Sequence, residues 1–244
     1  MSDASGLRFF GTNLKMNQTA EETERFVAGL SRTGGGSVQR FVIPPFTSLA
    51  RVVEAAHAAG ILLGAQNMHW AESGELTGEI SGRMLRSLGV DLVLVGHAER
   101  RDTFGETDAQ IRRKVEAALA HDLRVLLCVG DSAAEHRCGA AVDTVLRQAR
   151  LALEGVTDRS RVIVAYEPVW AIGAGSTPAE PQEIRPVVAA LREWLGETPL
   201  LYGGSVNARS APGYVRLPGI DGLFVGRAAW TPDGFANVLQ AAAA

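Results

Sequence analysis

Eight short apolar segments recur along the 244-residue chain, and longer segments with helical periodicity separate them. The short segments are rich in Val, Leu and Ile, which is typical of parallel strands buried on both faces. The expected strands are residues 8–11, 40–43, 62–66, 92–96, 125–129, 162–166, 200–203 and 222–226. Eight strand–helix units in roughly 250 residues have the number and size of a closed parallel barrel. The sequence therefore predicts an α/β barrel.

Amphipathic segments between the strands support this architecture. Residues 107–120 place Ile111, Val115 and Leu119 on one face, and residues 102–107 offer N-cap residues. Further helices are expected over residues 20–30, 46–59, 140–153 and 181–195. A doubly wound sheet would usually have fewer strands, and no Gly-x-Gly-x-x-Gly sequence follows the first one. No low-complexity linker divides the chain, so we expect a single domain over residues 1–244.

The composition limits the partners and the compartment. Hydrophobic residues make up 46% of the chain and can fill a core, while the formal net charge of −3 argues against nucleic acid or an anionic membrane as a partner. Cys128 and Cys138 form no CxxC pair and have no zinc-ligand spacing, which favours a reducing compartment. Neither a signal peptide nor a membrane-spanning segment is visible. We therefore expect a cytoplasmic globular protein.

A carboxylate follows the sixth predicted strand. Glu167 is followed by Pro168, which disfavours helical geometry before it, and then by an apolar segment that contains Gly173 and Gly175. Such a carboxylate beneath a flexible loop suits a catalytic base, because burial makes a carboxylate more basic and a closing loop excludes water. Taken alone, Glu167 could equally be a surface residue before an ordinary loop.

Other strand ends add complementary groups. The first strand leads to Asn13 and Lys15, the fourth to His97, and the last two to the glycine-rich residues 203–205 and 226–227. Each alone has an ordinary explanation as a surface lysine, a core histidine or a turn. In a parallel barrel, however, all these strand ends meet at the one face where active sites are built. The sequence therefore predicts a catalytic site there.

Long motifs in a fixed order make the chain resemble the triosephosphate isomerase family over nearly its whole length. The motifs are TNLKMN, GAQN, LTGEIS, GHAERR, AYEPVWAIG, YGGSV and DGLFVG. The resemblance implies a (β/α)8 TIM barrel and an isomerase that shifts a carbonyl between adjacent carbons of a small phosphorylated sugar. It also implies that the reaction needs neither a cofactor nor a metal.

Individual roles follow from the same resemblance. Glu167 would transfer the proton, while Asn13, Lys15 and His97 would act on the oxygens of the enediolate intermediate. Glu99 would hold Lys15 in place. The substrate phosphate would be bound by backbone N–H groups, for which the candidates are Gly173, Ser205, Gly226 and Arg227. The loop over residues 72–79, which contains Thr77, resembles the family segment that docks into a second subunit, so the resemblance implies a homodimer.

Several positions depart from the usual family residues. They are Ala98 for Ser, Asp131 for Glu, Ser176 for Lys, Pro178 for Ala and Arg227 for Gly. In the family, the tyrosine of the seventh strand, Tyr202 here, meets a backbone N–H at the position of Pro178, which proline lacks. The guanidinium of Arg227 could reach phosphate or a substrate hydroxyl.

The substrate is indicated by three further segments. DGLFVGRAAW, RFVIPPFT and AQNMHW are more similar to the branch of the family that isomerises erythrulose phosphates. We therefore expect conversion of L-erythrulose 1-phosphate to D-erythrulose 4-phosphate, as in erythritol catabolism. The alternative is the glycolytic reaction of dihydroxyacetone phosphate and glyceraldehyde 3-phosphate.

Two other classes of function fit the sequence less well. A Schiff-base aldolase would need a buried lysine on a later strand, whereas the sixth strand here ends in Glu167. A non-catalytic phosphate-binding barrel would have no need to keep Asn13, Lys15, His97 and Glu167 together. The sequence favours an isomerase over both.

Overall fold

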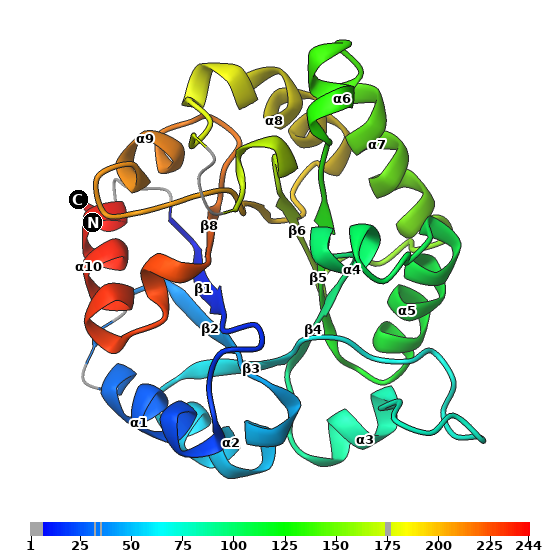
Figure 1. Ribbon diagram of the computed structural model, residues 1–244, viewed down its shortest axis with the longest axis vertical. Helices are drawn as coiled ribbons and strands as arrows, with labels where there is room; N and C mark the ends of the chain where they lie inside the picture. The colour runs from blue at the N-terminus through cyan, green and yellow to red at the C-terminus, as the bar shows by residue number, and fades with distance from the viewer. Residues whose placement is uncertain (1–6, 32, 35, 174–176) are drawn as a thin grey trace.

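An eight-stranded parallel barrel forms the centre of the molecule (Figure 1). The computed structural model describes residues 7–31, 33–34, 36–173 and 177–244. The strands are β1 (Phe9–Asn13), β2 (Gln39–Ile43), β3 (Ile61–Ala65), β4 (Leu92–Val95), β5 (Arg124–Val129), β6 (Val162–Tyr166), β7 (Leu200–Tyr202) and β8 (Gly222–Val225). Each pairs in parallel with the next, and β8 pairs with β1, so the sheet closes on itself. The predicted (β/α)8 barrel is confirmed.

Helices surround the barrel (Figure 1). The longer ones are α1 (Ala20–Leu30), α2 (Leu49–Ala58), α5 (Asp108–Ala120), α7 (Ala141–Ala152), α8 (Pro181–Leu195) and α10 (Pro232–Ala243). The shorter ones are α3 (Gly82–Ser87), α4 (Ala98–Asp102), α6 (Ala133–Arg137) and α9 (Ala211–Val215). Single 3-10 turns are η1 (Phe46–Ser48), η2 (Val169–Ala171) and η3 (Arg227–Ala229). In the described part of the chain, no helix has the length and apolar character needed to cross a membrane.

The structure refines the helices expected from the sequence. The helix expected over residues 107–120 is α5, and its N-cap is Thr107, whose side chain accepts from the Gln110 backbone N–H. The segment 46–59 divides into η1 and α2, because the Ser48 backbone N–H bonds to the Pro45 carbonyl in a tighter turn. The four helices of five or six residues were not predicted, since so few residues give no periodic pattern.

Apolar side chains fill the inside of the barrel. The alternate strand residues that form this inner core are Phe41, Ile43, Leu92, Leu94, Leu126, Cys128, Ile163, Ala165, Leu201 and Phe224. Gly11 of β1 leaves the space that the ring of Phe41 occupies, since a Cβ at Gly11 would overlap that ring. The interior is therefore a packed core, and a ligand has room only at the ends of the barrel.

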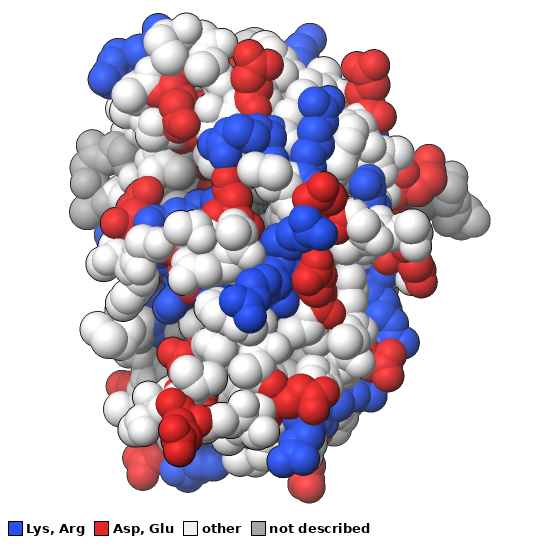
Figure 2. Space-filling view, turned by 90° about the vertical axis from the view of Figure 1, so that its right-hand side faces the viewer, with Lys and Arg blue, Asp and Glu red and all other residues white. Residues whose placement is uncertain are grey.

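Charges of both signs are mixed on the face of the molecule that carries α5 and α7. Figure 2 shows Lys and Arg side chains beside Asp and Glu side chains there, with no continuous basic area. The pairs include Arg112 Nε with Glu116 Oε1 at 2.8 Å and Arg147 Nη1 with Asp108 Oδ2 at 2.5 Å. Exposed pairs of this kind contribute little to stability.

The close approach at Gly11 predicts a loss of stability in Gly11→Ala. Overpacking a core costs about 1–3 kcal/mol, which in a chain of this length lowers the melting temperature by roughly 3–10 °C. Gly34→Ala is the matched control, because a Cβ there meets nothing within 4 Å. Thermal unfolding followed by circular dichroism measures both. Equal melting temperatures for the two variants would contradict the packing described here.

Candidate active site

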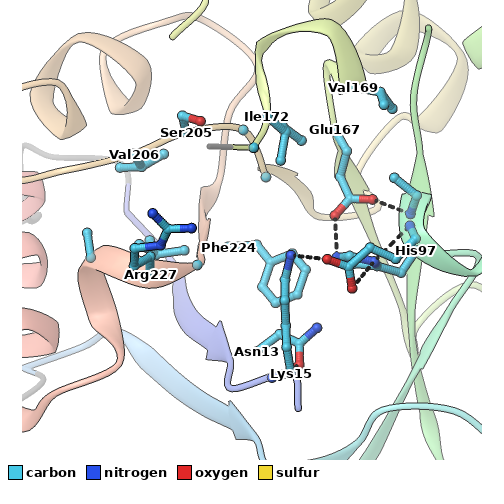
Figure 3. A pocket seen from close by; sticks show the side chains of 18 of the residues that line it. Asn13, Lys15, His97, Glu167, Val169, Ile172, Ser205, Val206, Phe224 and Arg227 are labelled. Carbon is cyan, nitrogen blue, oxygen red and sulfur yellow. Dashed lines mark hydrogen bonds and ion pairs between the residues drawn. The ribbon is translucent and has the colours of Figure 1, made fainter. Parts of the chain in front are cut away.

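A cavity of about 580 Å³ opens at the carboxyl ends of the barrel strands (Figure 3). Its size is typical of a site for a small molecule. All nine residues singled out from the sequence line it, and they are Asn13, Lys15, His97, Glu99, Glu167, Gly173, Ser205, Gly226 and Arg227. They follow β1, β4, β6, β7 and β8, so the closed parallel sheet is what brings them together.

Lys15 is held in an unusual backbone conformation. Its φ of 52° lies in the left-handed region, which is rare for residues other than glycine. Its backbone N–H donates to Asn13 Oδ1 at 2.9 Å, and its carbonyl accepts from Gln66 Nε2 at 2.8 Å. Its Nζ donates to Glu99 Oε1 at 2.6 Å. Both backbone and side chain are thus fixed, and the ammonium stands in the cavity beside Asn13 (Figure 3).

Glu167 is buried, with 3% of its surface exposed, and both of its carboxylate oxygens have partners. Oε2 accepts from the Ala98 backbone N–H at 3.0 Å, and Oε1 lies 3.2 Å from His97 Nε2. Both contacts hold the carboxylate at the end of β4 (Figure 3).

The backbone around His97 determines its tautomer. His97 is the N-cap of α4, and its Nδ1 accepts from the Glu99 backbone N–H at 3.3 Å. Because a nitrogen that accepts a hydrogen bond carries no proton, this contact places the ring proton on Nε2. Nε2 therefore presents a donor, which here faces Glu167.

The opposite side of the cavity carries the glycine-rich strand ends. Figure 3 shows Arg227 and Ser205 across the cavity from His97 and Glu167. Gly226 is followed by η3, and Ser205 Oγ donates to the Ala171 carbonyl at 2.8 Å, which ties the turn after β7 to η2. The cavity thus has a carboxylate and an imidazole on one side and backbone turns with an arginine on the other.

Asp131 lies at the centre of the contacts that hold η2. It is fully buried, and it accepts from the Tyr166 hydroxyl at 2.8 Å and from Trp170 Nε1 at 3.1 Å. The shorter side chain of Asp131 therefore still reaches the tryptophan. Burial, together with the negative charge of Asp131, raises the pKa of Tyr166. His136, which sequence analysis missed, stacks on Trp170 with ring centroids 3.9 Å apart and lies 3.5 Å from Asp131 Oδ2.

Tyr202 has a buried hydroxyl without a hydrogen-bond partner among the described residues. Its ring stacks on Tyr214, whose hydroxyl donates to the Ala179 carbonyl at 2.6 Å. A Cβ at Gly204 would overlap the Tyr202 hydroxyl, so this oxygen lies directly beneath the turn after β7. The expectation that Pro178 offers it no donor agrees with this geometry. Gly175 and the departure at Ser176, both in the loop after η2, lie outside the described residues.

Trp230 is a further cavity residue that sequence analysis missed. Its Nε1 donates to the Asn13 carbonyl at 2.8 Å, and its own carbonyl accepts from Gln18 Nε2 at 3.0 Å. These bonds join the loop after β8 to the loop after β1 at the level of the cavity. The only signal in the sequence is a tryptophan four residues after Gly226, which is weak because tryptophans usually fill cores.

A buried ion pair supports the loops after β3 and β4. Lys114 of α5 is 4% exposed, and its Nζ donates to Asn67 Oδ1 at 2.7 Å and to Glu106. Arg100 of α4 also donates to Glu106. Burial lowers the pKa of Lys114 despite these partners. Within the described part of the chain, no group of His, Cys, Asp and Glu residues could hold a metal ion.

We predict that removal of the Tyr166 hydroxyl lowers the stability of the fold, whereas removal of the Tyr202 hydroxyl does not. Tyr166→Phe leaves the buried Asp131 without one donor, so we expect unfolding free energy to fall by about 1–3 kcal/mol. Tyr202→Phe removes a hydroxyl that has no partner, so we expect a change within about 0.5 kcal/mol. Urea unfolding of both variants tests the pair. A loss in Tyr202→Phe as large as that in Tyr166→Phe would mean that the Tyr202 hydroxyl has a partner.

Comparison with known proteins agrees with this geometry. A family model described as triosephosphate isomerase matches residues 8–242. A protein of Mesorhizobium japonicum named L-erythrulose-1-phosphate isomerase is 44% identical, with 96% of each chain covered. Proteins of the same name are 43% identical in Rhizobium meliloti and 40% in Rhizobium rhizogenes, with 96–99% of each chain covered. The chain belongs to the triosephosphate isomerase family.

Proposed function

We propose that this isomerase interconverts L-erythrulose 1-phosphate and D-erythrulose 4-phosphate. The observation that supports an isomerase most directly is the pairing of Glu167 with His97 Nε2 beside Lys15, opposite a set of backbone turns suited to phosphate. The similar proteins named L-erythrulose-1-phosphate isomerase support the choice of substrate.

The proposed reaction begins with proton transfer to Glu167. The carboxylate takes the proton from C3 of L-erythrulose 1-phosphate, and the electron pair of that bond forms the C2–C3 double bond while the C2 oxygen becomes negative. The protonated Glu167 then returns its proton to C2. The proton of the C3 hydroxyl passes by way of His97 Nε2 to the C2 oxygen, which leaves a carbonyl at C3 and a hydroxyl at C2. The product is D-erythrulose 4-phosphate, and no electrons leave the substrate.

His97 and Lys15 would stabilise the enediolate. The proton on His97 Nε2 is a donor for the two adjacent oxygens and can move between them, because a neutral imidazole both gives and accepts a proton. The fixed ammonium of Lys15 places a positive charge beside the developing negative charge, and its pairing with Glu99 holds it in position. Asn13, which binds the Lys15 backbone, completes the group.

The phosphate would lie on the other side of the cavity. The backbone N–H groups of Gly173, Ser205, Gly226 and Arg227 are the proposed donors, and the start of η3 favours an anion. The Arg227 guanidinium adds a charge-assisted donor that can reach phosphate. Because this side is separated from Glu167 by the width of the cavity, the substrate would span the site with its phosphate at Arg227 (Figure 3).

We further propose a cytoplasmic homodimer. The loop over residues 72–79 with Thr77 projects from the barrel (Figure 1), and it carries the 43%-exposed Leu76. Met16, directly after Lys15, is 95% exposed, which is unusual for a large apolar side chain next to a catalytic site. Two free cysteines support a reducing compartment. The substrate has the carbon skeleton of erythritol, so catabolism of that sugar alcohol is the proposed context.

The lysines of the chain leave little support for a Schiff-base aldolase. Only two lysines are present, and the structure gives both of them partners. Lys15 pairs with Glu99, and Lys114 is buried with Glu106 and Asn67, away from the cavity. Triosephosphate isomerase proper remains the alternative within the same chemistry.

A side-by-side assay of the two reactions tests the proposed substrate. We expect kcat/KM for L-erythrulose 1-phosphate to exceed that for dihydroxyacetone phosphate by at least about tenfold, the discrimination that roughly 1.4 kcal/mol provides. Both substrates are assayed on one enzyme preparation by following formation of the product ketose or aldose. A preference for dihydroxyacetone phosphate would replace the proposal by the triose reaction.

Glu167→Asp tests the role of the base. Shortening the side chain withdraws the carboxylate from the substrate carbon, so we expect kcat to fall by about 100-fold or more. Competitive inhibition by inorganic phosphate should stay the same, because the phosphate side of the cavity is untouched. Glu193→Asp makes the same change on the exposed face of α8 and should leave kcat unchanged. An unaltered kcat in Glu167→Asp would remove this residue from the mechanism.

A further inference from the structure

The cavity continues past His97 to the outer end of α4. Ala98, Glu99, Asp102 and Thr103 line this end, where the Ala98 backbone N–H donates to Glu167. Arg227 lies on the other side of the cavity from Glu167 (Figure 3). A second cavity of about 400 Å³ adjoins it. Ala98 and Asp102 line both cavities, so they form part of the boundary between the two.

Asp102 differs from the other charged residues of α4. Glu99 pairs with Lys15, and the two arginines of this helix pair with Glu106 and Asp108. The Asp102 carboxylate makes no hydrogen bond or ion pair with any residue that the structure describes. The Asp102 side chain is exposed, so water hydrates its carboxylate, and a ligand hydroxyl can replace that water at the end of the cavity remote from the phosphate side.

The carbon chain of the substrate places its fourth carbon at this end. In L-erythrulose 1-phosphate the phosphate is on C1, the reacting carbons are C2 and C3, and C4 carries a hydroxyl. With the phosphate at Arg227 and C2–C3 at Glu167 and His97, C4 extends beyond them toward α4. Dihydroxyacetone phosphate has no carbon at this place. The product D-erythrulose 4-phosphate has its hydroxymethyl group at the same end.

We infer that Ala98 and Asp102 form the subsite for the terminal hydroxymethyl group of a four-carbon ketose phosphate, an inference that rests on the proposed function. The methyl side chain of Ala98 leaves room for C4, and the Asp102 carboxylate accepts a hydrogen bond from the C4 hydroxyl. Thr103 lies beside it as a second exposed polar group, and its hydroxyl makes no hydrogen bond with the described residues.

This arrangement explains how the site can favour a four-carbon ketose phosphate over a three-carbon one. A hydrogen bond from a hydroxyl to a charged acceptor contributes more than one between neutral groups. A triose phosphate has no group that reaches Asp102, so the carboxylate then stays hydrated. The discrimination therefore depends on a contact that only the longer substrate makes.

The test measures selectivity, defined as kcat/KM for L-erythrulose 1-phosphate divided by kcat/KM for dihydroxyacetone phosphate. We expect Asp102→Ala to lower selectivity by about tenfold or more, the effect of losing one charge-assisted hydrogen bond. Ala98→Val should also lower selectivity, because two added methyl groups occupy the space for C4. With 4-deoxy-L-erythrulose 1-phosphate, Asp102→Ala should cost about tenfold less than it does with the parent substrate.

Two variants serve as controls. Arg227→Gly acts at the phosphate end, so it should lower kcat/KM for both substrates by the same factor and leave selectivity unchanged. Asp143→Ala removes an exposed, unpaired carboxylate on α7 that lines neither cavity, and it should alter neither reaction. Circular dichroism melting confirms that each variant is folded.

The outcomes separate this inference from the proposed function. A wild-type enzyme that does not convert L-erythrulose 1-phosphate refutes the proposed function and the subsite with it. A wild-type enzyme that does, together with an Asp102→Ala variant whose selectivity is unchanged, refutes the subsite alone. A loss in Asp102→Ala that is equal for the parent and the 4-deoxy substrate also refutes it, since the C4 hydroxyl would then have no part in the effect.

Discussion

The pairing of β8 with β1 is the constraint on which the site depends. Because all the strands are parallel, closing the sheet brings every strand end that carries a polar group to one face. The closure is tight at Gly222, where a Cβ would overlap the Phe9 carbonyl. Beyond the paired strand residues, Trp230 also connects the segment after β8 to the end of β1, because its Nε1 donates to the Asn13 carbonyl. The first and last segments of the chain therefore form one wall of the cavity together. This wall fixes the position of Lys15.

The position of the base is coupled to the loop that follows it. Glu167 is bound to the turn after β4 through the Ala98 N–H, and three residues later Trp170 is bound to Asp131. Pro168 lies between them and restricts the backbone. Glu167 and Trp170 are thus each tied by a hydrogen bond to a turn at the carboxyl ends of the strands, and only two residues separate them in the chain.

The sequence predicts the barrel well because its signal is repeated in every strand–helix unit. It also identifies the residues that line the cavity, since strand ends of a parallel barrel share one face whatever the details of packing. It does not predict which side chains pair. Such pairs join segments that lie far apart in the chain, so no local sequence pattern predicts them. Examples are Trp230 with Asn13 and His136 with Trp170, and the unpaired state of Asp102 is of the same kind. Short helices such as α4 are not predicted for a related reason: tertiary contacts, rather than helix propensity, stabilise them.

The two cysteines differ in exposure, so a thiol-reactive probe can reach only one of them. Burial, reinforced by the neighbouring Glu167, raises the pKa of the Cys128 thiol well above its usual value, and no part of the residue is exposed. Cys138, by contrast, is exposed at the end of α6, which packs against η2. A maleimide dye would therefore attach at one position without mutagenesis, next to the loop that carries Trp170. Such a dye would report on the surroundings of that loop without any substitution in the chain.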